Sequence, residues 1–191
     1  MKKFIVLAAL LAAGLAQAEG TDASFSYDYK DKQNSTQSNQ VLGLTVGQNL
    51  GNGFAVEGRM ENEKVDPGAG ATQKQEGLVQ VKGIYDISTG TMFTPFAALA
   101  VGNKNKSTVD FPYWVGEVGV KAKINDMFGV RYGWRQRTAF DNNTTNSYDT
   151  RENSIALTAA VTKQDTIGIR YAQERGTSDY NTSGIFYTRS F

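Results

Sequence analysis

The sequence predicts an all-β transmembrane protein, an antiparallel up-and-down barrel of about ten strands. Apolar and polar residues alternate with a period of two over many short segments. Short turns and longer polar loops separate these segments alternately. The chain also holds too little other apolar material to cover so many apolar faces. We therefore expect the apolar faces to meet lipid and the charged faces to line the interior.

The clearest hairpin covers residues 113–137, with a turn at Asn125-Asp126. In its first strand Trp114 and Val118 fall on one face, and Glu117 and Lys121 fall on the other, because successive strand side chains point to opposite faces. The second strand repeats the pattern: Phe128, Val130, Tyr132 and Trp134 share a face and oppose Arg131, Arg135 and Arg137. Aromatic residues stand near the strand ends, as expected of girdles at the two bilayer interfaces.

The remaining strands follow from the same alternation and from the turn residues between them. We expect strands at residues 22–30, 40–48, 54–63, 76–86, 93–102, 113–124, 128–137, 152–162, 166–175 and 182–191. The long loops would then be 31–37, 64–74, 103–112, 140–150 and 176–181. The face of strand 93–102 is ambiguous, because Phe96, Ala98 and Ala100 compete with Ala97, Leu99 and Val101.

Ten strands is an even number, and each is near the roughly 9–11 residues that a tilted membrane strand needs. Both termini then lie on the short-turn side, which is periplasmic in bacterial barrels, and the long loops face outward. Barrels of eight or twelve strands are the alternatives, and a soluble β-sandwich is the structural alternative.

The first residues read as an export signal. Lys2 and Lys3 precede an apolar run at 4–15, and Ala16-Gln17-Ala18 has the small residues of a cleavage site. The run is short for a spanning helix, which needs roughly 20 apolar residues. We predict a signal peptide at 1–18, one barrel domain at 19–191 and a location in the bacterial outer membrane.

The composition excludes several function classes. The chain has no histidine and no cysteine, which removes the usual general base, the usual zinc ligands and thiol chemistry. Its 20 basic and 19 acidic residues are nearly balanced, which gives no reason to expect nucleic-acid binding. We expect no enzyme activity, no cofactor and no metal site.

The polar strand faces supply the candidate residues for the interior. On the lipid face a charged Arg or Lys at the bilayer midplane would cost about 2–4 kcal/mol, so these side chains are expected to point inward. The candidates for the lumen and its selectivity are Arg59, Lys82, Lys121, Lys123, Arg131, Arg135, Arg137, Arg170, Glu57, Glu61 and Glu117. Two interpretations remain open: an electropositive track that passes anions, or a plug in which pairs such as Glu117 with Arg131 seal the barrel.

Two resemblances to known proteins support a barrel. Residues 184–191, GIFYTRSF, resemble the C-terminal signature of outer-membrane barrels, with Tyr187 and Phe191 as the assembly signal, although Arg189 stands at a position that is usually apolar. Residues 26–29 with 52–54, 112–135 and 165–171 are similar to the small monomeric porins specific for acidic oligosaccharides, the oligogalacturonate porins. Those porins have twelve strands, so ten strands here would give a narrower lumen.

The second resemblance implies a monomer and an arginine track, and it assigns that role to Arg131, Arg135 and Arg170. We expect a small channel for passive diffusion of small solutes, with a modest anion preference. The alternative is a non-conducting structural or adhesive barrel that acts through its outer loops. Either protein would meet outer-membrane lipid, lipopolysaccharide and the barrel-assembly machinery.

Overall fold

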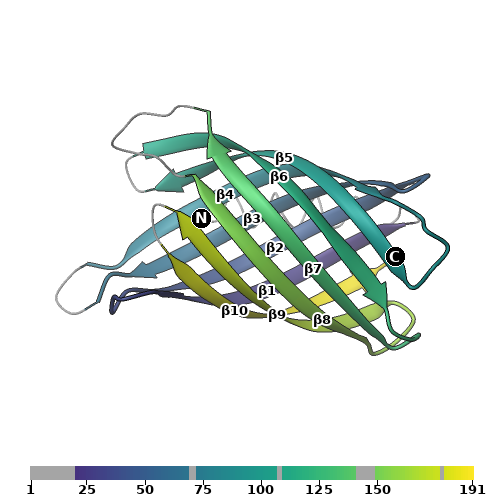
Figure 1. Ribbon diagram of the computed structural model, residues 1–191. Coiled ribbons are helices and arrows are strands. Elements are labelled where there is room, and N and C mark those ends of the chain that lie inside the picture. The colour runs from purple at the N-terminus through teal and green to yellow at the C-terminus, as the bar shows by residue number, and fades with distance from the viewer. Residues whose placement is uncertain (1–19, 69–71, 107–108, 141–148, 177–178) are drawn as a thin grey trace.

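The computed structural model describes residues 20–68, 72–106, 109–140, 149–176 and 179–191. Ten antiparallel strands form one closed barrel in which each strand pairs with its neighbours in the sequence, and β1 closes the ring by pairing with β10 (Figure 1). The predicted number of strands is confirmed, and the soluble sandwich is excluded. The strands are β1 (Thr21–Lys32), β2 (Ser38–Gly51), β3 (Phe54–Asp66), β4 (Lys74–Asp86), β5 (Phe93–Lys106), β6 (Val109–Lys123), β7 (Phe128–Ala139), β8 (Thr150–Ala160), β9 (Asp165–Gly176) and β10 (Tyr180–Ser190).

Successive connections between strands alternate between the two ends of the barrel. The turns that join β2 to β3, β4 to β5, β6 to β7 and β8 to β9 lie together at the right of Figure 1, which we call the short-turn end; the opposite end, at the left, is called the long-loop end after the loops expected there. Asn52 and Gly53, which join β2 to β3, both have positive φ, the geometry that a tight two-residue hairpin turn requires. Phe191 N donates to Thr21 O at 2.9 Å, so the C-terminal residue lies beside the start of β1 at the short-turn end.

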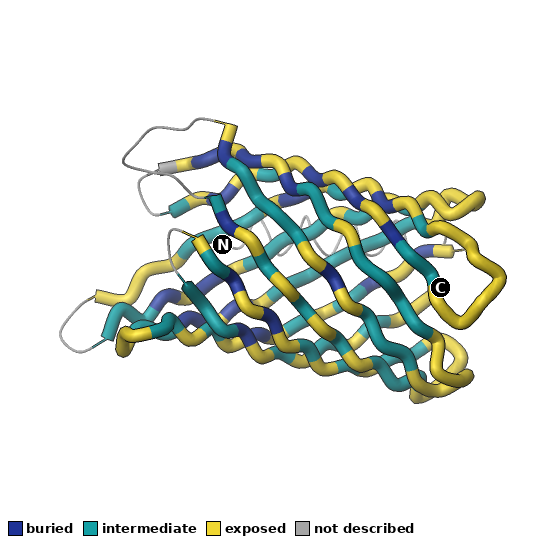
Figure 2. Tube along the Cα trace, in the orientation of Figure 1, coloured by how far each residue is buried: buried dark blue, intermediate teal, exposed yellow. Residues whose placement is uncertain are grey.

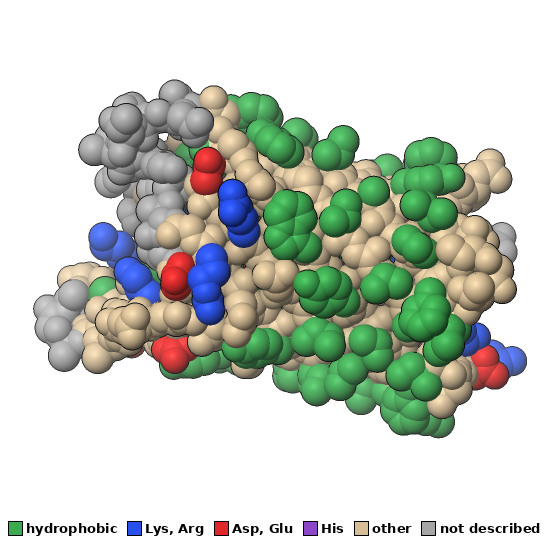
Figure 3. All heavy atoms as spheres, viewed as in Figure 1, with side chains coloured by type: hydrophobic (Ala, Val, Ile, Leu, Met, Phe, Trp, Pro, Cys, Tyr) green, Lys and Arg blue, Asp and Glu red, His purple; other side chains and the backbone are tan. Residues whose placement is uncertain are grey.

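The outer surface of the barrel is apolar. Exposed and less exposed residues alternate along the strands (Figure 2), and large hydrophobic side chains cover the outside (Figure 3). Leu99, in the middle of β5, is 71% exposed. A water-soluble monomer rarely exposes an apolar surface of this extent, so the belt is a lipid-facing surface. Its aromatic members include Tyr27, Tyr29, Phe54, Tyr85, Trp114, Phe128, Tyr132, Trp134, Tyr171 and Tyr187.

The ambiguous face of β5 is resolved. Phe96, Ala98 and Ala100 are buried and point inward, while Leu99 and Val101 are exposed and point outward.

Several predicted strand ends are wrong at the long-loop end. β3 continues to Asp66, β5 continues to Lys106 and β6 already begins at Val109, where loops were expected at 64–74 and 103–112. Polar residues at these ends resemble a loop in sequence, yet they continue the barrel wall. The residues by which these strands are longer than expected include charged groups that face the lumen, such as Lys104.

Some predictions concern residues that the structure does not describe. The expected signal peptide at 1–18 lies outside the described residues, as do residues 141–148 of the fourth loop. Among the described residues, no helix is long and apolar enough to cross a membrane.

Candidate functional site: the barrel lumen

The lumen is lined by charged side chains that are joined in ion pairs. The paired charged residues, named at the end of this paragraph, come from inward-facing positions of eight strands. A ninth strand, β2, contributes Asn39, which donates a hydrogen bond to one of them, so the network extends around most of the barrel wall. The pairs desolvate both partners, so each is stable only where the geometry satisfies both groups. The paired lumen groups are Asp28, Lys30, Glu57, Arg59, Glu61, Glu63, Glu76, Lys82, Asp86, Lys104, Glu117, Lys121, Arg131, Arg135, Arg137, Glu152, Arg170 and Glu174.

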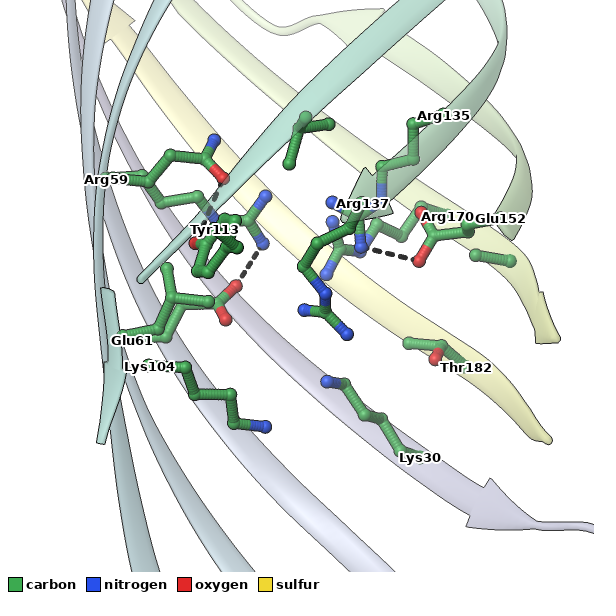
Figure 4. Close-up of a pocket in the computed structure, with 14 residues that line it drawn as sticks. Lys30, Arg59, Glu61, Lys104, Tyr113, Arg135, Arg137, Glu152, Arg170 and Thr182 are labelled. Carbon is green, nitrogen blue, oxygen red and sulfur yellow. Dashed lines mark hydrogen bonds and ion pairs between the residues drawn. The ribbon is translucent and has the colours of Figure 1, made fainter. Parts of the chain in front are cut away.

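The smallest of three cavities described along the lumen lies between the other two, and we call the part of the lumen around it the constriction. This cavity has a volume of about 30 Å³, close to the share of liquid volume of one water molecule. Side chains from opposite walls point toward one another across it, as Figure 4 shows for Arg59, Glu61, Arg135 and Arg137. The charged side chains around this constriction are six basic and two acidic: Lys30, Arg59, Lys104, Arg135, Arg137 and Arg170, with Glu61 and Glu152.

A vestibule lies on each side of the constriction. The vestibule toward the short turns has a volume of about 560 Å³ and reaches the turn residues Asn52 and Gly53. The vestibule toward the long loops has a volume of about 230 Å³ and reaches Gln37 and Tyr180. The lumen therefore has two vestibules joined by a constriction that side chains form; we call this constriction the waist.

The long-loop vestibule is crossed by a chain of ion pairs. Lys104 Nζ contacts Glu63 Oε2 at 2.7 Å and Glu76 Oε2 at 3.0 Å, and Lys30 Nζ lies 3.6 Å from Glu63 Oε1. Asn39 Nδ2 also donates a hydrogen bond to Glu63 Oε1, at 2.6 Å. Sequence reasoning missed Glu63, Glu76 and Lys104. Glu63 and Glu76 are end residues of the expected strands 54–63 and 76–86 and were not chosen as lumen candidates, whereas Lys104 lies beyond the expected end of strand 93–102. Continuing the alternation of β5 past Gly102 would have placed Lys104 inward.

Arginines of β7 line one wall of the waist and pair with glutamates of β8 and β9, of which only Glu152 borders the waist itself. Arg135 Nη2 donates to Glu152 Oε2 at 2.7 Å, and it lies 4.0 Å from Glu174 Oε2. Arg137 is more loosely held: its Nη2 lies 3.6 Å from Glu174 Oε2. Arg137 Nε is buried and has no hydrogen-bond partner among the described residues. On the facing wall Arg59 pairs with Glu61, its neighbour along β3.

A second network lines the short-turn vestibule. Glu117 accepts from Arg131 Nη2 at 2.8 Å and lies 3.7 Å from Lys82 Nζ, which also contacts Glu57 at 2.8 Å. Lys82 on β4 and Glu117 on β6 are separated by β5, whose inward residues Ala98 and Ala100 are small enough for the pair to pass over them. Lys121 likewise reaches Asp86 at 2.7 Å, and Asp86 was not among the predicted candidates.

Inward aromatic rings lie flat against the wall on glycines of the adjacent strand. The ring of Phe186 covers Gly168, where an added Cβ would overlap it, and Tyr113 covers Gly102 in the same way. Phe96 covers Gly119 and lies 4.3 Å from the guanidinium carbon of Arg131. Because each glycine lacks a Cβ, the aromatic ring can lie in the space beside the strand and does not have to extend across the lumen.

The remaining predicted residues lie at the short-turn end. Lys123 lies at the rim, where its side chain is 70% exposed and contacts Asp126 at 2.7 Å, so it does not line the constriction. This contact with Lys123 holds the pKa of the Asp126 carboxyl below its usual range. Tyr187 and Phe191 are outward and exposed, and the Tyr187 hydroxyl donates to Asp165 at 2.5 Å.

Comparison with known proteins shows likeness in structure alone. No protein-family model matches the sequence, and no curated protein sequence matches it. The COG4313 outer membrane channel from Pseudomonas putida F1 is similar with a TM-score of 0.64 at 9% identity, over 92% of this chain and 97% of that one. The transport unit of the autotransporter AIDA-I from Escherichia coli has a TM-score of 0.55 at 11% identity, over 92% and 91%.

The expected likeness to the oligogalacturonate porins is confirmed at the level of the fold. The KdgM porin, solved in complex with disordered oligogalacturonate, has a TM-score of 0.55 at 13% identity, over 88% of this chain and 99% of that one. Channels and autotransporter barrels thus share the architecture. With its apolar belt and closed ring of ten strands, the chain has the fold of a bacterial outer-membrane β-barrel.

Proposed function

We propose that the chain is a narrow outer-membrane channel through which small solutes diffuse passively, with a modest preference for anions. One observation carries the proposal: six basic and two acidic side chains surround the waist of the lumen. An ion that crosses the waist therefore passes more basic than acidic side chains, and each of the basic groups is also held by a carboxylate partner. Guanidinium groups bind anions through charge-assisted hydrogen bonds, which supports anion preference at such a constriction.

Arg137 is the group best placed to meet a passing anion. It borders both the waist and the long-loop vestibule, its contact with Glu174 is long, and its Nε lacks a partner among the described residues. The other waist arginines have closer carboxylate partners. Arg131, to which the porin resemblance assigns a role, lies instead in the short-turn vestibule, bound to Glu117.

The size of the waist limits which solutes can pass through the lumen. A cavity of about 30 Å³ has about the volume of one water molecule, so we expect a sugar to pass only when the waist side chains move aside. KdgM has been solved with oligogalacturonate; for the present chain the small cavity at the waist favours inorganic ions and small organic solutes. We propose a monomer in the outer membrane, assembled by the barrel-assembly machinery and surrounded by lipid and lipopolysaccharide.

The alternative is a non-conducting barrel that acts through its loops. The same narrow waist favours it, because Arg59 with Glu61 and Arg135 with Glu152 neutralise one another and fill the space. The two functions make opposite predictions for the purified barrel. The alternative requires zero conductance and a loop-dependent surface activity.

Conductance in a planar bilayer distinguishes them. The refolded barrel should give discrete steps, and under a salt gradient its reversal potential should indicate anion preference. Arg137→Gln should reduce that preference, whereas Lys123→Gln, at the exposed rim, should leave it nearly unchanged. A folded barrel without steps would overturn the channel, and cation preference in the wild type would overturn the selectivity.

A further inference from the structure

Two arginines face outward side by side at the long-loop end. Arg151 of β8 and Arg175 of β9 are register partners, and both belong to the outward alternation of their strands. Side chains directly opposite on adjacent strands have Cβ atoms about 4.5–5.5 Å apart, and like charges so placed repel. Lys and Arg side chains, with Asp and Glu side chains among them, gather at this end of the face shown in Figure 3, beside the hydrophobic surface of the barrel.

The described acidic groups near Arg151 and Arg175 neutralise little of the positive charge of the pair. Arg175 Nε lies 3.9 Å from Asp179 Oδ2, a contact between two half-exposed groups, and an exposed pair of this kind contributes little. Arg175 also donates to Glu174 O at 3.0 Å, and Gln33, with its side-chain amide oriented to satisfy its neighbours, accepts from Arg175 Nη1 at 3.1 Å and Nη2 at 2.8 Å; these neutral partners do not alter the charge of Arg175. Arg151 makes no ion pair within the described part of the chain. Asp149, two residues before Arg151, accepts from Ala139 N at 3.2 Å, and Glu152, the next residue, faces the lumen and pairs with Arg135.

The pair lies just beyond the apolar belt. Moving along β8 and β9 from the arginines, the next outward register partners are Asn153 with Gln173, and then Ile155 with Tyr171. The amides bind the girdle: Tyr132 donates to Asn153 Oδ1 at 3.0 Å, and Gln173 donates to the Tyr171 hydroxyl at 3.2 Å. Hydrocarbon-facing side chains, aromatic hydroxyls, amides and arginines thus follow in the order in which a bilayer passes from tails to phosphates.

We propose that Arg151 and Arg175 together bind a phosphate group of lipid A, the phosphorylated glycolipid of the outer leaflet. Two arginines at register-paired positions of neighbouring strands suit a phosphomonoester, which accepts several charge-assisted hydrogen bonds and carries more negative charge than the phosphodiester of a phospholipid. The anion relieves the repulsion between the arginines. The inference rests on the outer-membrane location proposed above and is independent of conductance, because both side chains face away from the lumen.

Lipid retention in native mass spectrometry tests this site. The purified barrel in mild detergent is mixed with bisphosphorylated lipid A, dephosphorylated lipid A or phosphatidylglycerol. We expect wild-type protein to retain bisphosphorylated lipid A, and the double variant Arg151→Gln with Arg175→Gln to retain about tenfold less, a loss of roughly 1.4 kcal/mol. Lys64→Gln is the matched control, because Lys64 faces outward between Gln40 and Gln75 with no neighbouring arginine.

The other lipids and free phosphate separate the possible sources of the anion. Dephosphorylated lipid A and phosphatidylglycerol should bind about as weakly as lipid A binds the double variant, and inorganic phosphate should not displace lipid A. Equal retention by wild type and double variant would overturn the site, and so would equal retention of phosphatidylglycerol, or displacement by inorganic phosphate. Conductance recorded on the same preparations should not differ between the variants. Arginine-dependent retention by a non-conducting barrel would refute the channel and leave this site standing.

Discussion

Asp28 of β1 and Arg170 of β9 form a two-pronged ion pair across β10, the strand between them. Arg170 Nε donates to Asp28 Oδ1 at 2.6 Å, and its Nη2 contacts Oδ2. Both residues lie in register with Gly184 of β10. A Cβ at position 184 would overlap the Asp28 carboxylate. The absence of a side chain at Gly184 therefore creates the passage through which the pair meets.

Gly184→Ala should destabilise the barrel by displacing this pair. We expect a loss of about 1–3 kcal/mol in the free energy of unfolding, the usual cost of inserting a methyl group into a filled site. Urea unfolding in lipid vesicles, followed by tryptophan fluorescence, measures it. Gly58→Ala is the matched control, since an added Cβ there meets nothing within 4 Å, and its effect should stay within about 0.5 kcal/mol. Equal stability of the two variants would contradict this role of Gly184.

Glu117→Gln should increase anion preference. Glu117 neutralises both Lys82 and Arg131 in the short-turn vestibule, so losing its charge leaves two cations facing the path. The reversal potential under a salt gradient should shift toward that of chloride. Asp126→Asn also removes one negative charge, but at a fully exposed turn, and should give a much smaller shift. An unchanged reversal potential in Glu117→Gln would show that the vestibule does not lie on the conduction path, and a shift toward cation preference would contradict the prediction.

Gly168 and Phe186 should be energetically coupled. The three nearest atoms to a Cβ added at Gly168 all belong to the Phe186 ring, so Gly168→Ala alone forces the ring from the wall. In a Phe186→Ala background the same change meets no ring and should cost much less. A double-mutant cycle of unfolding free energies should give a coupling of about 0.5–3 kcal/mol. Strictly additive effects would mean that the ring does not rest on this glycine.

The alternation of residues predicts the barrel, but it does not determine which charges meet. Period-two patterning places Arg131, Arg135 and Glu117 on the inner face, because one slip in register would turn every charge toward lipid. The pairing of Arg131 with Glu117 could be anticipated, since β6 and β7 form a local hairpin. The role of Gly184 could not, because it depends on the register between β1 and β10, at opposite ends of the sequence.

The waist was also beyond sequence reasoning. Its width depends on how long side chains from facing walls fold into the bore, and Lys104 enters it only because β5 extends to Lys106. The sequence at 103–106 is polar, and such a segment is as typical of a loop as of a wall that faces water. The excess of basic over acidic side chains at the waist can therefore be recognised only when both the strand ends and the positions of the side chains in the lumen are known.

Leu99→Arg tests whether the outer belt faces lipid. Leu99 lies mid-strand on β5 and is 71% exposed, so in a water-soluble protein arginine there would be tolerated. At the bilayer midplane it should cost about 2–4 kcal/mol, whereas Asn103→Arg, also outward on β5 but nearer the long loops, should cost about 0–1 kcal/mol. Unfolding free energies in lipid vesicles give the comparison. Equal costs would contradict a membrane midplane at Leu99, because hydrocarbon penalises a charge according to its depth and water does not.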